Sequence, residues 1–136
     1  MREILFRGKR CDNGKWVYGD LAHFPDKTNI DTHKNSQPWR GYAVDQETVG
    51  QYTGLTDKNG KNIFEGDICK FREWSKGDMC WVGKVHYEYQ QFVISGNPNK
   101  ECESPFTLVM SRFVPENIEI IGNIHDNPEL LGGKND

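Results

Sequence analysis

Two Asn-Gly pairs constrain the fold of this chain more than any other feature of the sequence. Asn13-Gly14 and Asn59-Gly60 are each followed by Lys, by apolar and aromatic residues, and then by Gly-Asp. An Asn-Gly pair adopts the positive φ angles of a tight hairpin turn at little cost. The similarity indicates either a duplicated binding unit or the reuse of favourable hairpin chemistry, and both interpretations predict antiparallel strands around each pair.

The composition favours the same fold class. Glycine accounts for 14 of the 136 residues and aromatic residues for 12%, while long runs of Ala, Leu, Glu and Lys are missing. This balance favours a mainly β protein with frequent turns. A chain of this length buries about two-thirds of the surface that its unfolded form exposes, so a core forms without metals or disulfides.

The order of residues predicts where the strands lie. Glu3–Arg7 and Lys15–Leu21 read as an N-terminal hairpin, and 23–40 reads as a long polar loop. Residues 81–89 alternate between an aromatic face and a polar face, which is the period of a strand, and Gln91–Ile94 returns beside them. The segment from 95 to 105 is predicted as another polar loop.

The end of the chain predicts one more strand and one helical turn. Ile118, Ile120 and Ile124 share an apolar face, with Gly122 between them. Pro128 suits the first position of a helix, with Asp126 or Asn127 as its cap.

These elements predict a mainly β domain that contains a small, strongly bent β-barrel of Src-homology-3 type. An additional N-terminal β-hairpin packs beside the barrel, and a short C-terminal helical turn follows it. We expect one domain over residues 1–136, made of an N-terminal β subdomain over about 1–55, the barrel over about 56–125 and a tail over 126–136.

Charge and cysteine content narrow the function classes only slightly. The net charge of -3 argues for no particular partner, and the basic cluster near the N-terminus is too small for a strong DNA footprint. The four cysteines are scattered without zinc-ligand spacing. The chain starts without a hydrophobic leader, so we expect a reduced cytoplasmic location and no membrane partner.

Carboxylates near the turns are the candidates for acid-base chemistry. They are Asp20, Asp57, Glu65 and Asp67. Two carboxylates in unlike environments could act as acid and base, but carboxylates beside glycine in turns usually accept hydrogen bonds from local amides. Glycine-rich phosphate motifs and histidine metal motifs are absent from the sequence. We therefore assign no catalytic residue, no metal ligand and no cofactor.

Aromatic and cationic side chains are the better candidates for binding. Trp16 and Tyr18 could stack on a ligand or fill the core, and four residues are predicted to point outward from strands, namely Lys70, Arg72, Lys84 and His86. Nucleic-acid binding would require a continuous cationic stripe, for which the candidates are Arg2, Arg7, Arg10, Lys70 and Lys84.

Several blocks in sequence order resemble the YopX family of phage and prophage proteins. They are Ile4–Lys9, Trp16–Leu21, Thr48–Gly60, Ile63–Ile68 and Ile120–Leu131. The structural signature within or beside them comprises Gly14, Asp20, Asn59, Gly60, Glu65, Gly66 and Asp67. The resemblance implies a bacterial or phage source and a mostly β fold with a small barrel. It implies no catalytic residues, because the molecular activity of the family is undefined.

Two positions depart from what the resemblance leads us to expect. Cys69 stands where an aliphatic residue is more typical, which suggests a buried thiol. Residues 88–91 lack a glycine turn before the returning aromatic strand.

The sequence thus predicts a non-enzymatic phage or prophage accessory protein that binds an unknown macromolecule or assembles with itself through exposed strand edges. One alternative is a nucleic-acid-binding small barrel. The other is an enzyme that uses Glu65 and Asp67.

Overall fold

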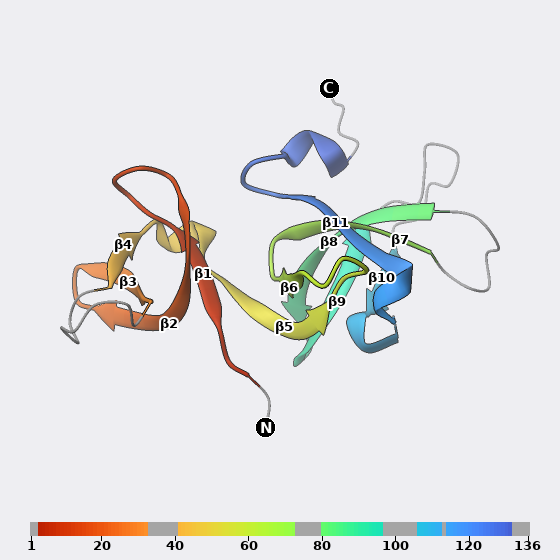
Figure 1. Ribbon diagram of the computed structural model, residues 1–136, viewed down its shortest axis with the longest axis horizontal. Helices are drawn as coiled ribbons and strands as arrows, with labels where there is room; N and C mark the ends of the chain where they lie inside the picture. The colour runs from red at the N-terminus through yellow and green to blue at the C-terminus, as the bar shows by residue number, and fades with distance from the viewer. Residues whose placement is uncertain (1–2, 33–40, 73–79, 97–105, 113, 132–136) are drawn as a thin grey trace. The chain divides into compact units, whose positions relative to one another are not determined.

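The computed structural model describes residues 3–32, 41–72, 80–96, 106–112 and 114–131. Eleven strands and four short 3-10 helices follow one another within these ranges (Figure 1). They are β1 (Phe6–Lys9), β2 (Trp16–Phe24), β3 (Lys27–Asp31), β4 (Tyr42–Val44), η1 (Gln46–Thr48), β5 (Gly50–Thr56), β6 (Asn62–Phe64), β7 (Asp67–Arg72), β8 (Cys80–Glu88), β9 (Gln91–Gly96), β10 (Phe106–Val109), η3 (Met110–Arg112), η4 (Pro115–Asn117), β11 (Ile118–Asn123) and η5 (Pro128–Leu131). The predicted mainly β fold is confirmed.

The strands form two sheets, with the orders β4-β3-β2-β1-β5-β6 and β10-β9-β8-β7-β11. All the strand pairs with a described register are antiparallel. The chain divides into two compact units, residues 1–54 and 55–136. Below, these are called the first and the second unit.

The first Asn-Gly pair makes the turn of a hairpin in the first unit. β1 pairs with β2 from Phe6↔Gly19 to Lys9↔Trp16. Gly14 has a φ of 72°, and the Asn13 side chain accepts a hydrogen bond from the Lys15 N–H at 2.9 Å. The positive φ explains why glycine suits this position.

The predicted loop over 23–40 is wrong for its first part. β2 continues to Phe24, and β3 returns beside it with Leu21↔Ile30 in register. The sequence pattern did not predict β3, because this strand buries the polar residues Thr28 and Asn29 together with Ile30 and so lacks an apolar pattern. Residues 33–40 lie outside the described part of the chain.

β4 pairs with β3 and also reaches the end of β1. Arg10 and Val44 form an isolated antiparallel bridge, in which the Asp45 N–H donates to the Lys9 carbonyl at 2.9 Å. The sheet of the first unit therefore curls back on itself, so that β1 has β2 on one side and both β4 and β5 on the other.

The second unit holds the main hydrophobic core. Its buried members come from six elements and are Ile63, Cys69, Phe71, Val85, Ile94, Met110 and Ile118. Leu55, Trp81, Phe92, Leu108 and Ile120 pack against them. Cys69 is fully buried in this cluster, where a thiol acts as a small apolar side chain.

β8 and β9 form a hairpin whose turn carries no glycine. Tyr87↔Phe92 and Glu88↔Gln91 are the last pairs of the ladder, which leaves Tyr89 and Gln90 as a two-residue turn. Both have positive φ, 53° and 68°, as a type I′ turn requires. The hairpin forms although its turn residues are unfavourable, because the flanking strands and the Tyr87–Phe92 ring contact at 5.0 Å fix the register.

The C-terminal segment folds against the end of β11. A register shift between Ile120 and Gly122 reverses which side chains face the core. A Cβ on Gly122 would lie only 2.7 Å from Leu130 Cδ1, so glycine at this position lets η5 approach the strand. η5 lies where the sequence predicts a helical turn.

Candidate binding face

Strand alternation brings four of the predicted binding residues onto one face of the second unit. On β7, Lys70 and Arg72 are exposed while Cys69 and Phe71 are buried. Directly opposite residues in a sheet point to the same side, and Lys70 pairs with Val82 while Ile68 pairs with Lys84. Lys70, Arg72, Lys84 and His86 therefore share a face, which we call the β7–β8 face.

The cations on this face are staggered. Lys84 lies opposite Ile68, so it is a diagonal neighbour of Lys70. Like charges directly opposite each other destabilise a sheet, and the stagger avoids this arrangement. Ile68 belongs to the same face but is fully buried. Its partner in β11 is Gly122, and η5 packs over Gly122 and also contacts β8. The helical turn η5 therefore covers Ile68.

A pocket of about 240 Å³ opens where the β7–β11 ladder ends at Ile118↔Phe71. Its lining comprises Lys58, Lys70, Phe71, Arg72, Glu116, Asn117, Ile118 and Glu119. Lys58 Nζ and Glu119 Oε1 form an ion pair at 3.3 Å, with both side chains partly exposed. The pocket thus presents charges of both signs beside a buried apolar floor.

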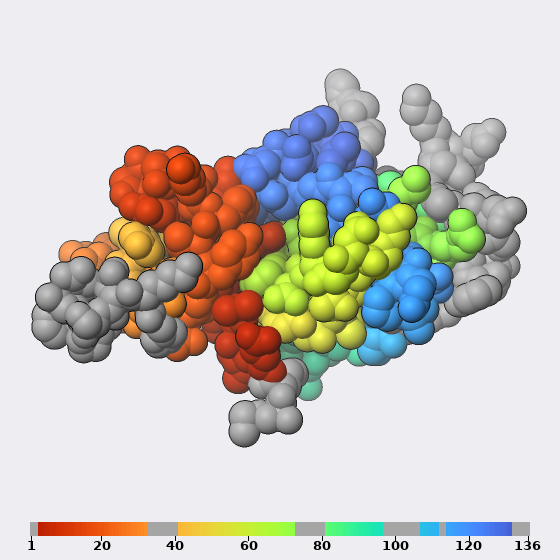
Figure 2. All heavy atoms as spheres, viewed as in Figure 1, coloured from red at the N-terminus to blue at the C-terminus, as the bar shows by residue number. Residues whose placement is uncertain are grey.

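The hairpin that carries Lys58 lies against β11. The Lys58 N–H donates to the Ile118 carbonyl at 2.9 Å, and Figure 2 shows the yellow-green hairpin beside the blue C-terminal residues. Lys58 reaches the pocket because this backbone bond anchors it there.

His86 contacts a residue that the sequence did not indicate. Its Nε2 lies 2.8 Å from Ser95 Oγ, and its Nδ1 lies 3.7 Å from Glu88 Oε1. The predicted loop over 95–105 starts too early, since β9 continues to Gly96. If the sequence had indicated a two-residue turn at 89–90, counting back along the two strands would have placed Ser95 opposite Lys84. The sequence did not indicate this turn, because it contains no glycine.

Trp16 and Tyr18 lie in the first unit. The Arg7 guanidinium lies 4.6 Å and the Lys9 ammonium 5.7 Å from the centre of the Trp16 ring. Trp16 is half-buried, while Tyr18 is 45% exposed. The two aromatic side chains therefore line a cationic side of the β1–β2 hairpin rather than an apolar core.

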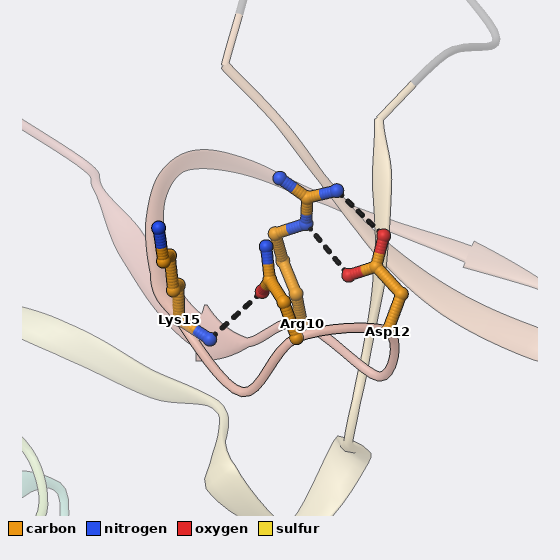
Figure 3. Close-up of polar contacts among 4 residues, drawn as sticks. Arg10, Asp12 and Lys15 are labelled. Carbon is orange, nitrogen blue, oxygen red and sulfur yellow. Dashed lines mark hydrogen bonds and ion pairs between the residues drawn. The ribbon is translucent and has the colours of Figure 1, made fainter.

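Two arginines of the predicted cationic stripe are engaged within the first unit. Arg7 is only 6% exposed. Arg10 donates two hydrogen bonds to Asp12, at 2.9 and 2.6 Å, as Figure 3 shows, and lies over the Tyr42 ring. The hydrogen bond from Arg10 lowers the pKa of Asp12. Arg2 lies outside the described residues.

The structural-signature residues lie mostly at turns. Gly14, Gly60 and Gly66 all have positive φ, and Asn59 occupies the turn before Gly60. Asp20 is exposed on β2, and Glu65 is half-buried between β6 and β7. Asp67 is 2% exposed, and its carboxylate accepts a hydrogen bond from the Phe64 N–H at 2.8 Å.

Asp57, another of the candidate acid-base residues, accepts three hydrogen bonds from backbone N–H groups. Its Oδ1 accepts hydrogen bonds from the N–H groups of Asn59 and Lys61, both at 2.9 Å, and its Oδ2 accepts one from Ile120 at 3.0 Å. Burial raises the pKa of Asp57, but the three backbone donors outweigh it and leave the pKa below its usual value. The carboxylate stays ionised and holds the chain in place.

Within the described ranges, no group of three or more His, Cys, Asp or Glu side chains is arranged to hold a metal ion. The helices described there are also too short to cross a membrane.

Comparisons with known proteins identify a family and a fold. A family model described as YopX protein matches residues 5–132. Comparison with curated proteins finds no match. The crystal structure of protein EF1440 from Enterococcus faecalis is similar with a TM-score of 0.53 and 21% identity, covering 96% of this chain and 99% of that one. At that identity the likeness supports the fold alone.

Proposed function

The chain belongs to the YopX family, and from this membership we propose that it is a non-enzymatic phage or prophage accessory protein. In this proposal it acts in the cytoplasm of the bacterial host as a β module that binds a protein, either a partner or a second copy of itself. Closure of the second unit into a small barrel of Src-homology-3 type remains part of the proposal.

The pocket is surrounded by charges of both signs, and this observation favours a protein partner over a polyanion. Lys70 and Arg72 share the pocket with Glu116 and Glu119, and Glu88 lies close to His86 further along the face. A polyanion would meet repulsion at each of these carboxylates, whereas a protein surface supplies complementary charges of both signs. Charges arranged in this way determine which partner binds and how fast it associates.

Exposed strand edges offer a route to self-assembly. β10 is an outer strand of the five-stranded order in the described structure, whereas the outer edge of β11 is covered by the hairpin that bonds to the Ile118 carbonyl and the Ile120 N–H. An outer strand has backbone N–H and C=O groups that a second chain can pair with.

Nucleic-acid binding is the second candidate, because Arg72 and Lys70 follow one another along β7 and Lys84 lies diagonally across from Lys70 on β8. Such binding would weaken steeply with salt. An enzyme that uses Glu65 and Asp67 is disfavoured, because Asp67 is buried and accepts a bond from a turn amide.

Chemical crosslinking in host cells tests the protein-partner proposal. The double variant Lys70→Glu with Arg72→Glu should lose the crosslinked species that the unmodified chain forms, while Lys15→Glu, on an exposed turn of the first unit, should retain it. Nuclease treatment before purification separates nucleic-acid bridging from direct contact. Light scattering on the purified chain measures its molar mass. A mass above that of one chain indicates that the partner is a second copy, and the mass of one chain indicates a foreign protein. Identical crosslinked species from the double variant would refute the assignment of this face.

A further inference from the structure

Three side chains line up where the β7–β8 face continues onto the β8–β9 hairpin. Glu88 Oε1 lies 3.7 Å from His86 Nδ1, and His86 Nε2 lies 2.8 Å from Ser95 Oγ. Lys84 is the cross-strand partner of Ser95. The register explains the alignment, since Lys84, His86 and Glu88 alternate along β8 and Ser95 faces the same side from β9.

The order of atoms is carboxylate, imidazole, hydroxyl. A carboxylate near Nδ1 favours the tautomer with its proton on that nitrogen. Nε2 then has a free lone pair, and the Ser95 hydroxyl donates to it. A serine that donates to a neutral imidazole can transfer its proton as it attacks, which is how a weak hydroxyl nucleophile is activated.

The strength of each contact differs. The contact of 2.8 Å between His86 and Ser95 is a short hydrogen bond. The 3.7 Å between Glu88 and His86 is an ion-pair distance, longer than a hydrogen bond, so Glu88 acts through its charge. We therefore treat Glu88 as a positioning residue for His86.

Lys84 supplies a charge where a reaction would need it. Directly opposite residues in an antiparallel pair have Cβ atoms about 5 Å apart, so the Lys84 side chain is long enough to bring its ammonium beside Ser95 Oγ. A cation there stabilises the oxyanion that forms when a hydroxyl attacks a carbonyl carbon. Access is open, since the side chains of His86 and Glu88 are 32% and 38% exposed.

We propose that Ser95 is an activated nucleophile that accepts an acyl group from an activated ester or thioester. Ser95 Oγ bonds to the carbonyl carbon while its proton moves to His86 Nε2. The bond from that carbon to the leaving oxygen or sulfur then breaks, and His86 returns the proton to the leaving group. The products are acyl-Ser95 and a free alcohol or thiol, with no change of oxidation state. This reactivity goes beyond the proposed binding function and does not depend on it.

Acetyl transfer from 4-nitrophenyl acetate to the purified full-length chain tests the proposal. Trypsin cleaves after Lys84 and Lys100, so Ser95 falls in the peptide 85–100, and Ser111 falls in the peptide 101–112. Ser111 is an internal reference because it is exposed in η3. Acetylation of Lys84 would block cleavage after it, and fragmentation of each peptide distinguishes acetyl-Ser95 from acetyl-Tyr87 or acetyl-Tyr89 and acetyl-Ser111 from acetyl-Ser104.

We expect acetyl-Ser95 to form at least about tenfold faster than acetyl-Ser111. Loss of a general base typically costs about 10²–10⁴-fold, and this partly exposed site belongs at the low end, so His86→Gln should slow acetylation of Ser95 by about a hundredfold. Glu88→Gln should slow it by about fivefold or less, as for an exposed ion pair. In the His86→Gln background, Glu88→Gln should have no further effect, since Glu88 acts through His86.

Thermal melting of each variant keeps folding and reactivity apart. Equal acetylation of Ser95 and Ser111, or acetylation of Ser95 that survives His86→Gln in a folded chain, would overturn the proposal. An effect of Glu88→Gln that persists without His86 would overturn the positioning role. None of these results bears on the crosslinking test, so the binding function and the reactive serine fail independently.

Discussion

Asp57 ties the second Asn-Gly turn to the last strand through one buried side chain. Its two oxygens accept hydrogen bonds from Asn59 and Lys61 on the hairpin and from Ile120 on β11. The last contact spans 63 positions of sequence. A single carboxylate therefore stabilises both a local turn and a distant strand.

Replacing Asp57 with Asn should lower the free energy of unfolding by about 3 kcal/mol, because the amide keeps one acceptor oxygen but turns an N–H donor toward the Ile120 N–H. Urea unfolding measures the change. Glu129→Gln, on the exposed first turn of η5, is the matched control and should stay within about 0.5 kcal/mol of the original chain. Equal midpoints for the two variants would show that Asp57 is not structural.

The lowered pKa of Asp57 also predicts a pH dependence. The unfolded chain binds the proton at about pH 3.9, which is above the pKa in the folded chain. The stabilisation is therefore complete above about pH 4 and is lost as the pH falls through the folded value. The difference in stability between the original chain and Asp57→Asn should shrink on acidification below pH 4, and a constant difference would contradict this.

At the scale of elements, the β8–β9 hairpin departs most from sequence rules. Its turn places Tyr89 and Gln90 at positive φ, where residues other than glycine are strained. Tyr89 is also 87% exposed, so its ring gains little from packing.

Replacing Tyr89-Gln90 by Asn-Gly should stabilise the protein by about 1–2 kcal/mol, because both residues suit a type I′ turn. A rise in the melting temperature would confirm the turn type. The reverse order, Gly-Asn, provides a composition-matched control that should gain less, and no gain from either variant would exclude the strain.

The contact between β11 and η5 depends on the missing side chain of Gly122. A Cβ there would lie 2.7 Å from both Leu130 Cδ1 and Asn127 Oδ1. Gly122→Ala should therefore displace η5 and cost about 1–3 kcal/mol. Limited proteolysis should cut the C-terminal segment faster in this variant. Gly54→Ala is the control, since open space surrounds a Cβ at that position and only the φ of 89° is unfavourable. In this variant the C-terminal segment should remain protected from proteolysis.

Across the whole molecule, the two units differ in how much apolar surface they bury. Among the described residues, the buried hydrophobic side chains of the first unit are Ile30 and Val44. The second unit buries ten, on strands that include β7, β8 and β9. The hydrophobic contribution to stability is therefore concentrated after Gly54.

Native-state hydrogen exchange should reveal this imbalance. Amides of β2 and β3 should exchange through openings of lower free energy than amides of β7 and β8, because local stability follows buried apolar contacts. Mass spectrometry of pepsin fragments measures both sets in one sample. Equal protection of the two sets would mean that the chain unfolds as one cooperative body.

Local patterns predicted much of the fold but few of the contacts between distant segments. The alternation along 81–88 and the Asn-Gly turns were sufficient for β8 and for two hairpins, because they depend on neighbours in sequence. β3 was missed because tertiary packing buries its polar Thr28 and Asn29. The Ser95–His86 contact and the Asp57–Ile120 contact both depend on strand register, which short patterns do not encode.

The pairing of β7 with β11 has a consequence for how the chain is made. β7 cannot pair with β11 until residues 118–123 have left the ribosome. The strands of the first unit, in contrast, pair with one another among residues 6–51. During synthesis, one edge of β7 therefore stays unpaired while most of the remaining chain is translated. Until then, Asp57 also lacks the distant amide that completes its set of donors. A nascent chain stalled before residue 118 would therefore be open to chaperones and proteases at the strand that carries Lys70 and Arg72.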